Sequence, residues 1–292
     1  MSAFIFIMDL YGVIGWPIEH SLSPAMQNAA FEALGIDAKY ERIPVRPEDL
    51  EDFLLNDTKY KGFNITIPHK VRAREILENR FPYNRSDAFS RLVILSGAVN
   101  TVKRVGDKIE YLNTDVSGFS YSIEKDLGFK TSEHKGTNVL ILGCGGAARA
   151  VMVDLHASSV RRIYAYDIDK NAVESAKRQF SKLSVISQEE IKDKIKECDL
   201  LVNATPIGMK EGDPLPIDKK LLRKDLYVYD VVYNRETQLV KDARSLGAKA
   251  VTGEGMLVAQ GAYSFFIWTE VPAIKVIDVM RKALSSALKD KR

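Results

Sequence analysis

The chain has 292 residues, a length that suits two domains of ordinary size better than one. Its hydrophobic content of 46% is enough for packed cores, which excludes a disordered protein. The 42 basic and 39 acidic residues leave a net charge of +3, without a long block of like charge. We therefore expect a small-molecule partner rather than nucleic acid or a membrane surface, and the oligomeric state stays open.

Two cysteines occur, Cys144 and Cys198, which are too few for a disulfide framework and are not spaced for zinc. This cysteine usage is typical of the cytoplasm, and no metal site is predicted. The apolar start from Phe4 to Met8 has no basic region before it and no small-residue cleavage site, so it predicts the start of a strand rather than a signal peptide. No run of about 18 apolar residues is present that could span a bilayer.

Apolar runs alternate with segments of helical period along the whole chain. This pattern is typical of a parallel or mostly parallel sheet with crossover helices, so the predicted fold class is α/β. In the first third of the chain the pattern predicts strands over 11–15, 40–45 and 62–66, and helices over 25–34, 47–55 and 70–78.

A second series begins with the β-rich run from Thr137 to Gly143, and further strands are predicted over 162–167, 200–204 and 226–231. The polar segment 130–136 has no apolar periodicity and predicts a boundary between the two series. The tail 255–288 is predicted to be helical. Its part over 257–268 is too apolar for a solvated helix, so we expect it to pack against the first domain.

The residues Gly143-Cys144-Gly145-Gly146-Ala147-Ala148 follow a strand pattern and open a helix pattern, which is the context that gives G-x-G-x-x-A its meaning. Glycines permit a tight turn and close backbone approach, and the helix N-terminus offers N–H groups to a pyrophosphate. The alternative is a simple tight turn, and the context disfavours it. Gly143, Gly145, Gly146 and Ala147 are therefore predicted to bind a dinucleotide, with Asp167 placed to accept hydrogen bonds from a ribose diol.

The segment Phe63-Asn64-Ile65-Thr66-Ile67-Pro68-His69-Lys70 resembles the N-x-T-x-P-x-K signature of the shikimate dehydrogenase family. Six further blocks resemble the same family in the same order, and together they cover nearly the whole chain. They are Ser21-Leu22-Ser23-Pro24, Gly97-Ala98-Val99-Asn100-Thr101, Asn113-Thr114-Asp115, the Gly143 loop, Asn203-Ala204-Thr205-Pro206-Ile207-Gly208-Met209 and Gly255-Met256-Leu257-Val258-Ala259-Gln260-Gly261.

The resemblance implies a two-domain organisation. Residues 1–114 would form an α/β substrate-binding domain that the C-terminal helices of 253–292 complete. Residues 115–252 would form a Rossmann-type dinucleotide-binding domain. The substrate would lie in the cleft between these domains, where closure excludes water from the hydride path.

Lys70 and Asp115 are the implied catalytic residues. Oxidation of a secondary alcohol needs a hydride acceptor and a group that handles the hydroxyl proton. A lysine ammonium near the oxygen donates a hydrogen bond and stabilises the developing alkoxide, and Asp115 would orient that ammonium. A lone lysine at a helix start is ordinarily a solvated charge, and the spacing of Asn64, Thr66, Pro68 and Lys70 reverses that interpretation.

A polar shell is implied for a cyclic polyol carboxylate, because hydroxyls and amides donate and accept without charging a small pocket. For Ser23 the alternative is a helix cap before Pro24. For Tyr233 the placement is less secure, since the proline that the family has soon after it is missing here. The implied substrate-binding residues are Ser21, Ser23, Asn64, Thr66, Asn100, Tyr233 and Gln260.

The nicotinamide end of the cofactor would be held by Thr205, Met209, Gly253 and Met256, by the resemblance. Many relatives carry an Asn-Arg-Thr triplet whose arginine clamps the 2′-phosphate of NADP, and the triplet here is Asp167-Ile168-Asp169. An isoleucine cannot pair with a phosphate and an aspartate repels it, so NAD is the predicted cofactor, with NADP possible. We expect nearby basic residues to soften the repulsion, namely Arg161, Arg162 and Lys170.

The predicted activity is reversible hydride transfer between shikimate and a nicotinamide cofactor. One alternative is a quinate-preferring enzyme of the same family, and another is a regulatory protein that binds nucleotide without chemistry. The presence of both Lys70 and Asp115 argues against the regulatory protein, since a sensor has no need for the pair. Flavin and folate dehydrogenases do not explain the block from Asn64 to Lys70.

Overall fold

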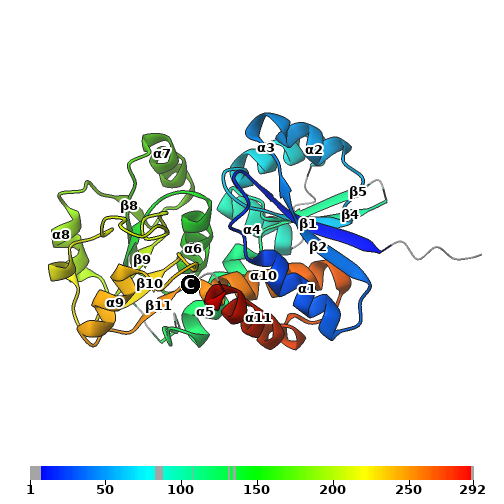
Figure 1. The fold of residues 1–292 in the computed structure, drawn as a ribbon. Helices are drawn as coiled ribbons and strands as arrows, with labels where there is room; N and C mark the ends of the chain where they lie inside the picture. Colours follow the sequence, from blue (N-terminus) through cyan, green and yellow to red (C-terminus); the bar gives the residue numbers. More distant parts are fainter. Residues whose placement is uncertain (1–7, 83–87, 107, 131, 134–135, 291–292) are drawn as a thin grey trace, which may run out of the picture. The chain divides into compact units, whose positions relative to one another are not determined.

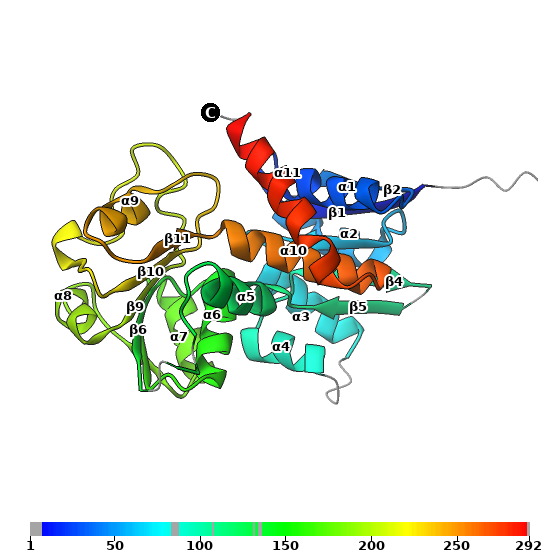
Figure 2. The same ribbon diagram turned by 90° about the horizontal axis from the view of Figure 1, so that it is seen from below.

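A computed structural model describes residues 8–82, 88–106, 108–130, 132–133 and 136–290 (Figures 1 and 2). The chain divides into two compact units. Unit 1 is Met1–Thr114 with Gly261–Arg292, and unit 2 is Asp115–Gln260. The mixed α/β class predicted from the sequence is confirmed. Of the strand start predicted over residues 4–8, residues 4–7 lie outside the described residues, and Met8 comes directly before the first strand.

Unit 1 is built on a five-stranded sheet in the order β2-β1-β3-β4-β5. β1 pairs in parallel with β2 and β3, whereas β4 pairs antiparallel with both β3 and β5. The strands are β1 Asp9–Gly15, β2 Ala38–Pro44, β3 Gly62–Ile65, β4 Thr101–Val105 and β5 Lys108–Leu112. The helices of this unit are α1 Ser23–Ala33, η1 Pro47–Asp49, α2 Leu50–Asn56, α3 Lys70–Arg80, α4 Ala88–Ser96, η4 Ala273–Lys275 and α11 Ile277–Lys289.

The hairpin of β4 and β5 has no counterpart among the predicted strands. Its strands are largely half-buried or exposed, with only Thr101, Val102 and Tyr111 buried, so they lack the continuous apolar run that marks the parallel strands. Because β4 runs antiparallel to β3, it begins at the edge where β3 ends, with Thr101 opposite Asn64. This pairing places Asn100 at the carboxyl edge of β3.

Unit 2 holds a six-stranded, fully parallel sheet in the order β11-β10-β9-β6-β7-β8. The chain leaves β6 toward β7 on one side and later fills β9 on the other, which makes the carboxyl end of β6 the switch point where such sheets bind ligands. The strands are β6 Asn138–Leu142, β7 Arg162–Tyr166, β8 Leu183–Val185, β9 Leu200–Asn203, β10 Tyr227–Asp230 and β11 Ala250–Thr252. The helices are α5 Asp115–Lys125, α6 Gly146–Ala157, α7 Lys170–Gln179, α8 Ile191–Lys194, η2 Ile195–Glu197, η3 Lys219–Leu221 and α9 Gln238–Ser245.

The units divide between Thr114 and Asp115 and not in the polar segment 130–136. The reason is that helix α5, which follows Asp115, packs on helix α6 of unit 2. The buried face of α5 carries Phe119, whose ring lies edge-on to that of Tyr229 with 5.0 Å between centroids. Helix α10, Glu254–Thr269, contains the second crossing, between Gln260 and Gly261. The chain therefore changes unit inside this helix rather than at residue 253.

The second half of α10 explains the apolar stretch in the sequence, since it is packed into unit 1. The ring of Trp268 lies 5.2 Å from that of Tyr11, and Phe265 lies 5.0 Å from Phe31. The Trp268 indole donates a hydrogen bond of 2.9 Å to the Val102 carbonyl. The predicted helical tail is confirmed as two helices, because α10 ends before Pro272 and α11 begins at Ile277.

Within the described ranges, no helix is both long and apolar enough to cross a membrane. The same residues include no group of three or more histidine, cysteine or acidic side chains arranged to hold a metal ion.

Candidate active site

The predicted substrate-side residues of unit 1 gather at one edge of its sheet. Thr66 and Lys70 follow the carboxyl end of β3, and the Thr66 amide donates to the Ile14 carbonyl of β1 at 2.9 Å. Gly15 ends β1 so close to Thr66 that a Cβ there would lie 2.6 Å from its methyl carbon. Only glycine lets the two strand ends approach in this way. Ser21 and Ser23 follow on the segment after β1.

Asn64 is held by four hydrogen bonds at this edge, where its side chain is buried. Its Oδ1 accepts from the Tyr40 hydroxyl at 2.7 Å. The two N–H groups of its Nδ2 are shared among three acceptors, the Ser264 hydroxyl at 2.8 Å, Thr101 Oγ1 at 3.1 Å and the Asn100 carbonyl at 3.1 Å. A carboxamide with this many partners has one orientation. The side chain is therefore fixed before any ligand arrives.

Asn100 belongs to the same network. Its Nδ2 donates to Thr114 Oγ1 at 2.9 Å, and its Oδ1 accepts from the Thr114 amide at 2.8 Å and from Thr101 Oγ1 at 2.9 Å. The Ser264 hydroxyl closes the network, 2.9 Å from Thr101 Oγ1 and 3.1 Å from Thr114 Oγ1. The two asparagines are thus one hydrogen-bonded cluster rather than separate side chains.

Four members of this cluster were not singled out from the sequence. Thr101 and Thr114 lie inside blocks that were, next to Asn100 and Asp115, so adjacency was an available signal. Tyr40 and Ser264 had none, because their contacts depend on the register of β2 and on the rotation of α10.

Ser21 and Ser23 were ambiguous between substrate contacts and helix caps. The N-cap of α1 is Leu22, whose side chain makes no capping hydrogen bond, and the Ser21 hydroxyl accepts from the amide of Ser23, the first residue of the helix, at 3.4 Å. Ser23 is buried and its hydroxyl is hydrogen-bonded with Tyr40, the partner of Asn64. The geometry therefore removes the cap interpretation for Ser23 and joins this serine to the cluster. Burial raises the pKa of the Tyr40 hydroxyl well above its usual value, so it stays a hydrogen-bond donor.

Lys70 and Asp115 each begin a helix. Lys70 is the first residue of α3 and half-buried, and its carbonyl accepts from the Val99 amide at 2.9 Å, which ties the helix start to the segment before β4. The preceding His69 is buried with Nε2 2.7 Å from the Val45 carbonyl, consistent with a structural role. Asp115 is the first residue of α5 and is buried. The two residues lie in different units.

The glycine loop has the geometry that the motif predicts. Gly143 has φ of 104°, and a Cβ there would lie 2.9 Å from the Ala204 carbonyl oxygen, so no other residue fits. Gly145 is the N-cap of α6 and has no side chain to cap the helix. Apart from its own neighbours in the chain, no described residue has an atom within 4 Å of the position that a Cβ would take. The start of α6 is therefore open to a pyrophosphate, and these residues fit a dinucleotide.

The Asp167 carboxylate accepts two hydrogen bonds from backbone amides of the protein. Its Oδ2 accepts from the Cys144 amide of the glycine loop at 2.6 Å, and its Oδ1 accepts from the Asp169 amide at 2.9 Å. Asp169 in turn caps α7, accepting from the Asn171 amide at 2.8 Å. Ile168 between them is 85% exposed. The edge after β7 thus presents two carboxylates and an apolar side chain.

The basic residues expected to soften this charge are placed differently. Arg162 begins β7 and Arg161 precedes it, with Arg161 Nε donating to Asn138 Oδ1 at 3.1 Å. Asp167 follows the opposite end of the same strand, roughly 16 Å away at about 3.3 Å per residue. That separation exceeds the Debye length of about 8 Å in physiological salt, so the expectation was wrong for both arginines. Lys170, which starts α7, remains nearby.

The residues predicted for the nicotinamide end follow β9, β10 and β11 at the same carboxyl edge. Thr205 uses its hydroxyl locally, donating to Asn203 Oδ1 at 2.6 Å and accepting from the Ile207 amide at 3.2 Å. Gly253 begins the segment after β11, where a Cβ would collide with the Val231 carbonyl oxygen. Two of the remaining residues are Met256, which is buried, and Met209, which is half-buried.

The last two predicted substrate residues lie in unit 2. Tyr233 is half-buried on the segment after β10, and burial raises the pKa of its hydroxyl. Its neighbour Asn234 donates to the Met209 carbonyl at 2.8 Å, which links this segment to the one after β9. Gln260 is in the first half of α10, with Nε2 donating to the Leu257 carbonyl at 2.9 Å.

Both cysteines are inert by this geometry. Cys144 and Cys198 are fully buried, and burial raises the pKa of each thiol to about 12. Because the thiolate is the reactive form, we expect a thiol reagent at pH 7–8 to label neither residue in the folded protein and both after denaturation. Rapid labelling of the native protein at either cysteine would contradict the structure.

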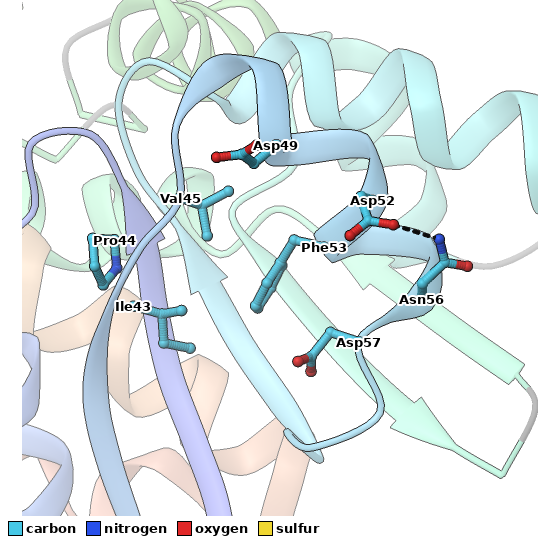
Figure 3. A pocket seen from close by; sticks show the side chains of 8 residues that line it. All are labelled: Ile43, Pro44, Val45, Asp49, Asp52, Phe53, Asn56 and Asp57. Carbon is cyan, nitrogen blue, oxygen red and sulfur yellow. Dashed lines mark hydrogen bonds between the residues drawn. The ribbon is translucent and has the colours of Figure 1, made fainter.

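A cavity of about 320 Å³ lies between the end of β2 and α2 (Figure 3). Its described lining has Phe53 and Ile43 at its apolar part, the aspartates Asp49, Asp52 and Asp57 around them, and no basic residue. A site of this charge disfavours a carboxylated substrate or a phosphate. It includes none of the predicted site residues.

The parallel sheet with an open glycine loop at its switch point defines unit 2 as a Rossmann-type dinucleotide domain, the class found in nicotinamide-dependent oxidoreductases. Two family models match the chain, one before this unit and one that begins near its end. The shikimate dehydrogenase substrate binding domain matches residues 13–102, and the shikimate 5′-dehydrogenase C-terminal domain matches residues 253–284. The chain belongs to the shikimate dehydrogenase family, which confirms the resemblance noted in the sequence.

Relatives match over nearly the full length. Shikimate dehydrogenase (NADP(+)) of Methanopyrus kandleri is 38% identical over 96% of this chain and 96% of its own. A crystal structure of shikimate dehydrogenase in complex with NADP+ is 33% identical, covers 96% of each chain and superposes with a TM-score of 0.82. Quinate dehydrogenase from Corynebacterium glutamicum in complex with NAD is 30% identical, with 95% and 99% covered and a TM-score of 0.79.

Proposed function

We propose that this protein catalyses reversible hydride transfer between shikimate and a nicotinamide cofactor, with NAD preferred. The observation that carries the proposal is the edge of the unit 1 sheet, where Ser23, Asn64 and Asn100 form one buried polar cluster beside Thr66 and Lys70. Fixed hydroxyls and carboxamides suit the ring hydroxyls of a cyclic polyol, because they discriminate by hydrogen bonding at positions set in advance.

The chemistry assigned to the chain is handling of the hydroxyl proton. When bound, the nicotinamide ring supplies the hydride acceptor. In the direction of ketone reduction, the Lys70 ammonium donates a proton to the substrate oxygen as negative charge develops there. In the direction of alcohol oxidation, the neutral Lys70 amine takes up the hydroxyl proton, and Asp115 orients the lysine side chain in both directions. The proposal requires both side chains to reach the same substrate hydroxyl during turnover.

NAD preference rests on the edge after β7. A 2′-phosphate placed there would meet the carboxylates of Asp167 and Asp169, with Ile168 unable to pair with it. A free ribose diol instead donates to a carboxylate oxygen, which still has lone pairs beyond those used by the Cys144 amide. The relatives in the comparison are named shikimate dehydrogenase (NADP(+)), so the proposed NAD preference is supported by this triplet alone.

The test is absorbance at the reduced-nicotinamide band with shikimate or quinate crossed against NAD and NADP. Reaction with shikimate and NAD is the expected result. Faster turnover of quinate would favour the quinate-preferring alternative, to which the quinate dehydrogenase match lends support. Absence of reaction in all four combinations, with cofactor still bound, would favour the regulatory protein.

Replacing Ser21 and Ser23 together with alanine should raise KM for the substrate by about 5- to 150-fold, the equivalent of one or two hydrogen bonds at about 1–3 kcal/mol. The affinity for NAD should not change. A matched control is Ser96→Ala, which removes another buried serine of unit 1, bonded to the Ala98 carbonyl at 3.1 Å, and should lower Tm without changing KM. If the double variant also showed a lower Tm with unchanged KM, the two serines would have a structural role only.

A further inference from the structure

Two side chains end neighbouring strands in unit 2 and are both fully buried. They are Asn203, the last residue of β9, and Asp230, the last residue of β10, which face each other in the parallel register. Asn203 Nδ2 donates to Asp230 Oδ1 at 2.9 Å. A buried carboxylate at a strand end is expensive to desolvate, so its retention calls for a reason.

The Asp230 carboxylate organises the segment that follows its own strand. Its Oδ1 accepts from the Val232 amide at 3.1 Å, and its Oδ2 accepts from the Thr237 hydroxyl at 2.6 Å. The Thr237 hydroxyl also caps α9, accepting from the Val240 amide at 3.3 Å. Tyr233 lies between these two attachment points, so the segment that carries it is held at both ends.

Through Asn203 the same carboxylate reaches the segment after β9. Asn203 Nδ2 donates to the Ile207 carbonyl at 3.0 Å as well as to Asp230, and Asn203 Oδ1 accepts from the Thr205 hydroxyl at 2.6 Å. The orientation of the Asn203 carboxamide is set by which of its atoms faces the carboxylate, because only the amide nitrogen can donate to Asp230. Asp230 therefore determines how Asn203 presents its oxygen to Thr205.

We propose that Asp230 is a positioning residue for the nicotinamide end of the cofactor, acting through Asn203 on the 203–209 segment and through Thr237 on the 231–237 segment. This inference rests on the proposed function, since these segments carry Thr205, Met209 and Tyr233. The adenine end is organised separately, by Asp167 and the glycine loop. Loss of the Asp230 side chain should therefore weaken binding of the nicotinamide end of the cofactor and leave binding of the adenine end unchanged.

Asp230 forms no ion pair with any described residue. Its three hydrogen-bond donors are uncharged, and burial raises the pKa of its carboxyl to about 6. The carboxylate borders a cavity of about 340 Å³ on whose described lining opposite charges are mixed. The charged lining residues are Lys210, Arg235, Lys241, Glu211, Asp213 and Glu236.

The test compares NAD with ADP-ribose, a probe that has the adenine end and lacks the nicotinamide. In Asp230→Ala we expect kcat with NAD to fall by about 30-fold and the Kd of NAD to rise by about tenfold, while the Kd of ADP-ribose stays within about twofold of wild type. Asp230→Asn keeps one oxygen for Asn203 and Val232 and should recover most of the activity. Unchanged kcat in Asp230→Ala, or equal weakening of NAD and ADP-ribose, would overturn the proposal.

A matched control is Asp242→Ala on α9, which removes another buried carboxylate of the same unit, bonded to Lys219 at 2.9 Å and to Gln238 at 3.0 Å. It should lower Tm and leave kcat unchanged. If Asp230→Ala does not fold, Thr237→Val and Thr237→Ser replace it. Valine should lower kcat by about fivefold and serine, which keeps the hydroxyl, should not; equal values for the two overturn the inference.

The comparison separates this inference from the proposed function. Failure of wild-type protein to bind NAD at all would contradict the proposed function and with it this inference. Binding and turnover by wild type with an unaffected Asp230→Ala variant would contradict the positioning role alone.

Discussion

Replacement of Lys70 by alanine is expected to lower kcat by about 10²-fold or more while substrate binding changes little, because the ammonium interacts most strongly with the charge that develops in the transition state. Steady-state kinetics with shikimate and NAD measure both quantities. Lys70→Met, which keeps the length of the side chain without its charge, should show the same loss. Near-normal kcat with a large rise in KM would show that Lys70 binds the ground state and the transition state equally well, and would contradict its catalytic role.

The matched control for this variant is Lys61→Ala. Lys61 is an exposed lysine of the same unit, with Nζ 2.6 Å from Asp9 Oδ1. An exposed ion pair contributes about 0–1 kcal/mol to stability, so this variant should keep wild-type kcat and lose little in Tm. Equal loss of activity in the two variants would show a general effect of removing charge rather than catalysis by Lys70.

The parts of the fold that the sequence predicted are those in which burial dictates composition. β6 and β9 are buried along their whole length and read as continuous apolar runs, and the glycine loop after β6 is marked by a turn that needs positive φ. The three-residue strands β8 and β11 were not predicted, since they are half-buried in large part and too short for a pattern.

Residues of the candidate site were predicted where they belong to a recognisable sequence block. They were missed where they contact a site residue that is distant from them in the sequence. The block from Asn64 to Lys70 was recognised from the spacing of its residues alone. Tyr40 and Ser264, which bond the same Asn64 amide, are 24 and 200 residues away from it. Their contacts are set by the order of β2, β1 and β3 and by the rotation of α10, and local sequence encodes neither.

The error about Arg161 and Arg162 has the same origin. Arg162 and Asp167 are five positions apart in the sequence, but these positions span the whole of β7. An extended strand separates its ends further than any other element of the same length. Proximity in sequence implies proximity of charge in a turn or a helix, and not across a strand.

The positions of these arginines bear on the proposed preference for NAD. With both arginines remote, a 2′-phosphate near Asp167 would meet like charge, which Lys170 at the start of α7 could partly offset. We expect kcat/KM of the wild type to favour NAD over NADP by about tenfold or more, equivalent to ~1.4 kcal/mol. Initial rates with each cofactor at saturating shikimate test this, and a wild-type preference for NADP would refute it.

The double variant Asp167→Asn with Ile168→Arg should move the preference toward NADP, because it removes the repulsion and adds a cation that can pair with the phosphate. Asparagine has one oxygen where aspartate has two, so it can accept from the Cys144 amide or from the Asp169 amide and not fully from both. Some loss of activity with either cofactor should therefore accompany the switch. Ile168→Ala is the matched control, and it should leave the preference as it is.

Ile168→Arg alone separates the two causes. If the missing cation dominates, this single change should raise kcat/KM with NADP although Asp167 is intact. If repulsion by Asp167 dominates, only the double variant should gain activity with NADP. Lys170→Ala completes the series, since the offset assigned to Lys170 predicts a further loss of NADP activity in this variant at unchanged NAD activity, measured as kcat/KM for each cofactor.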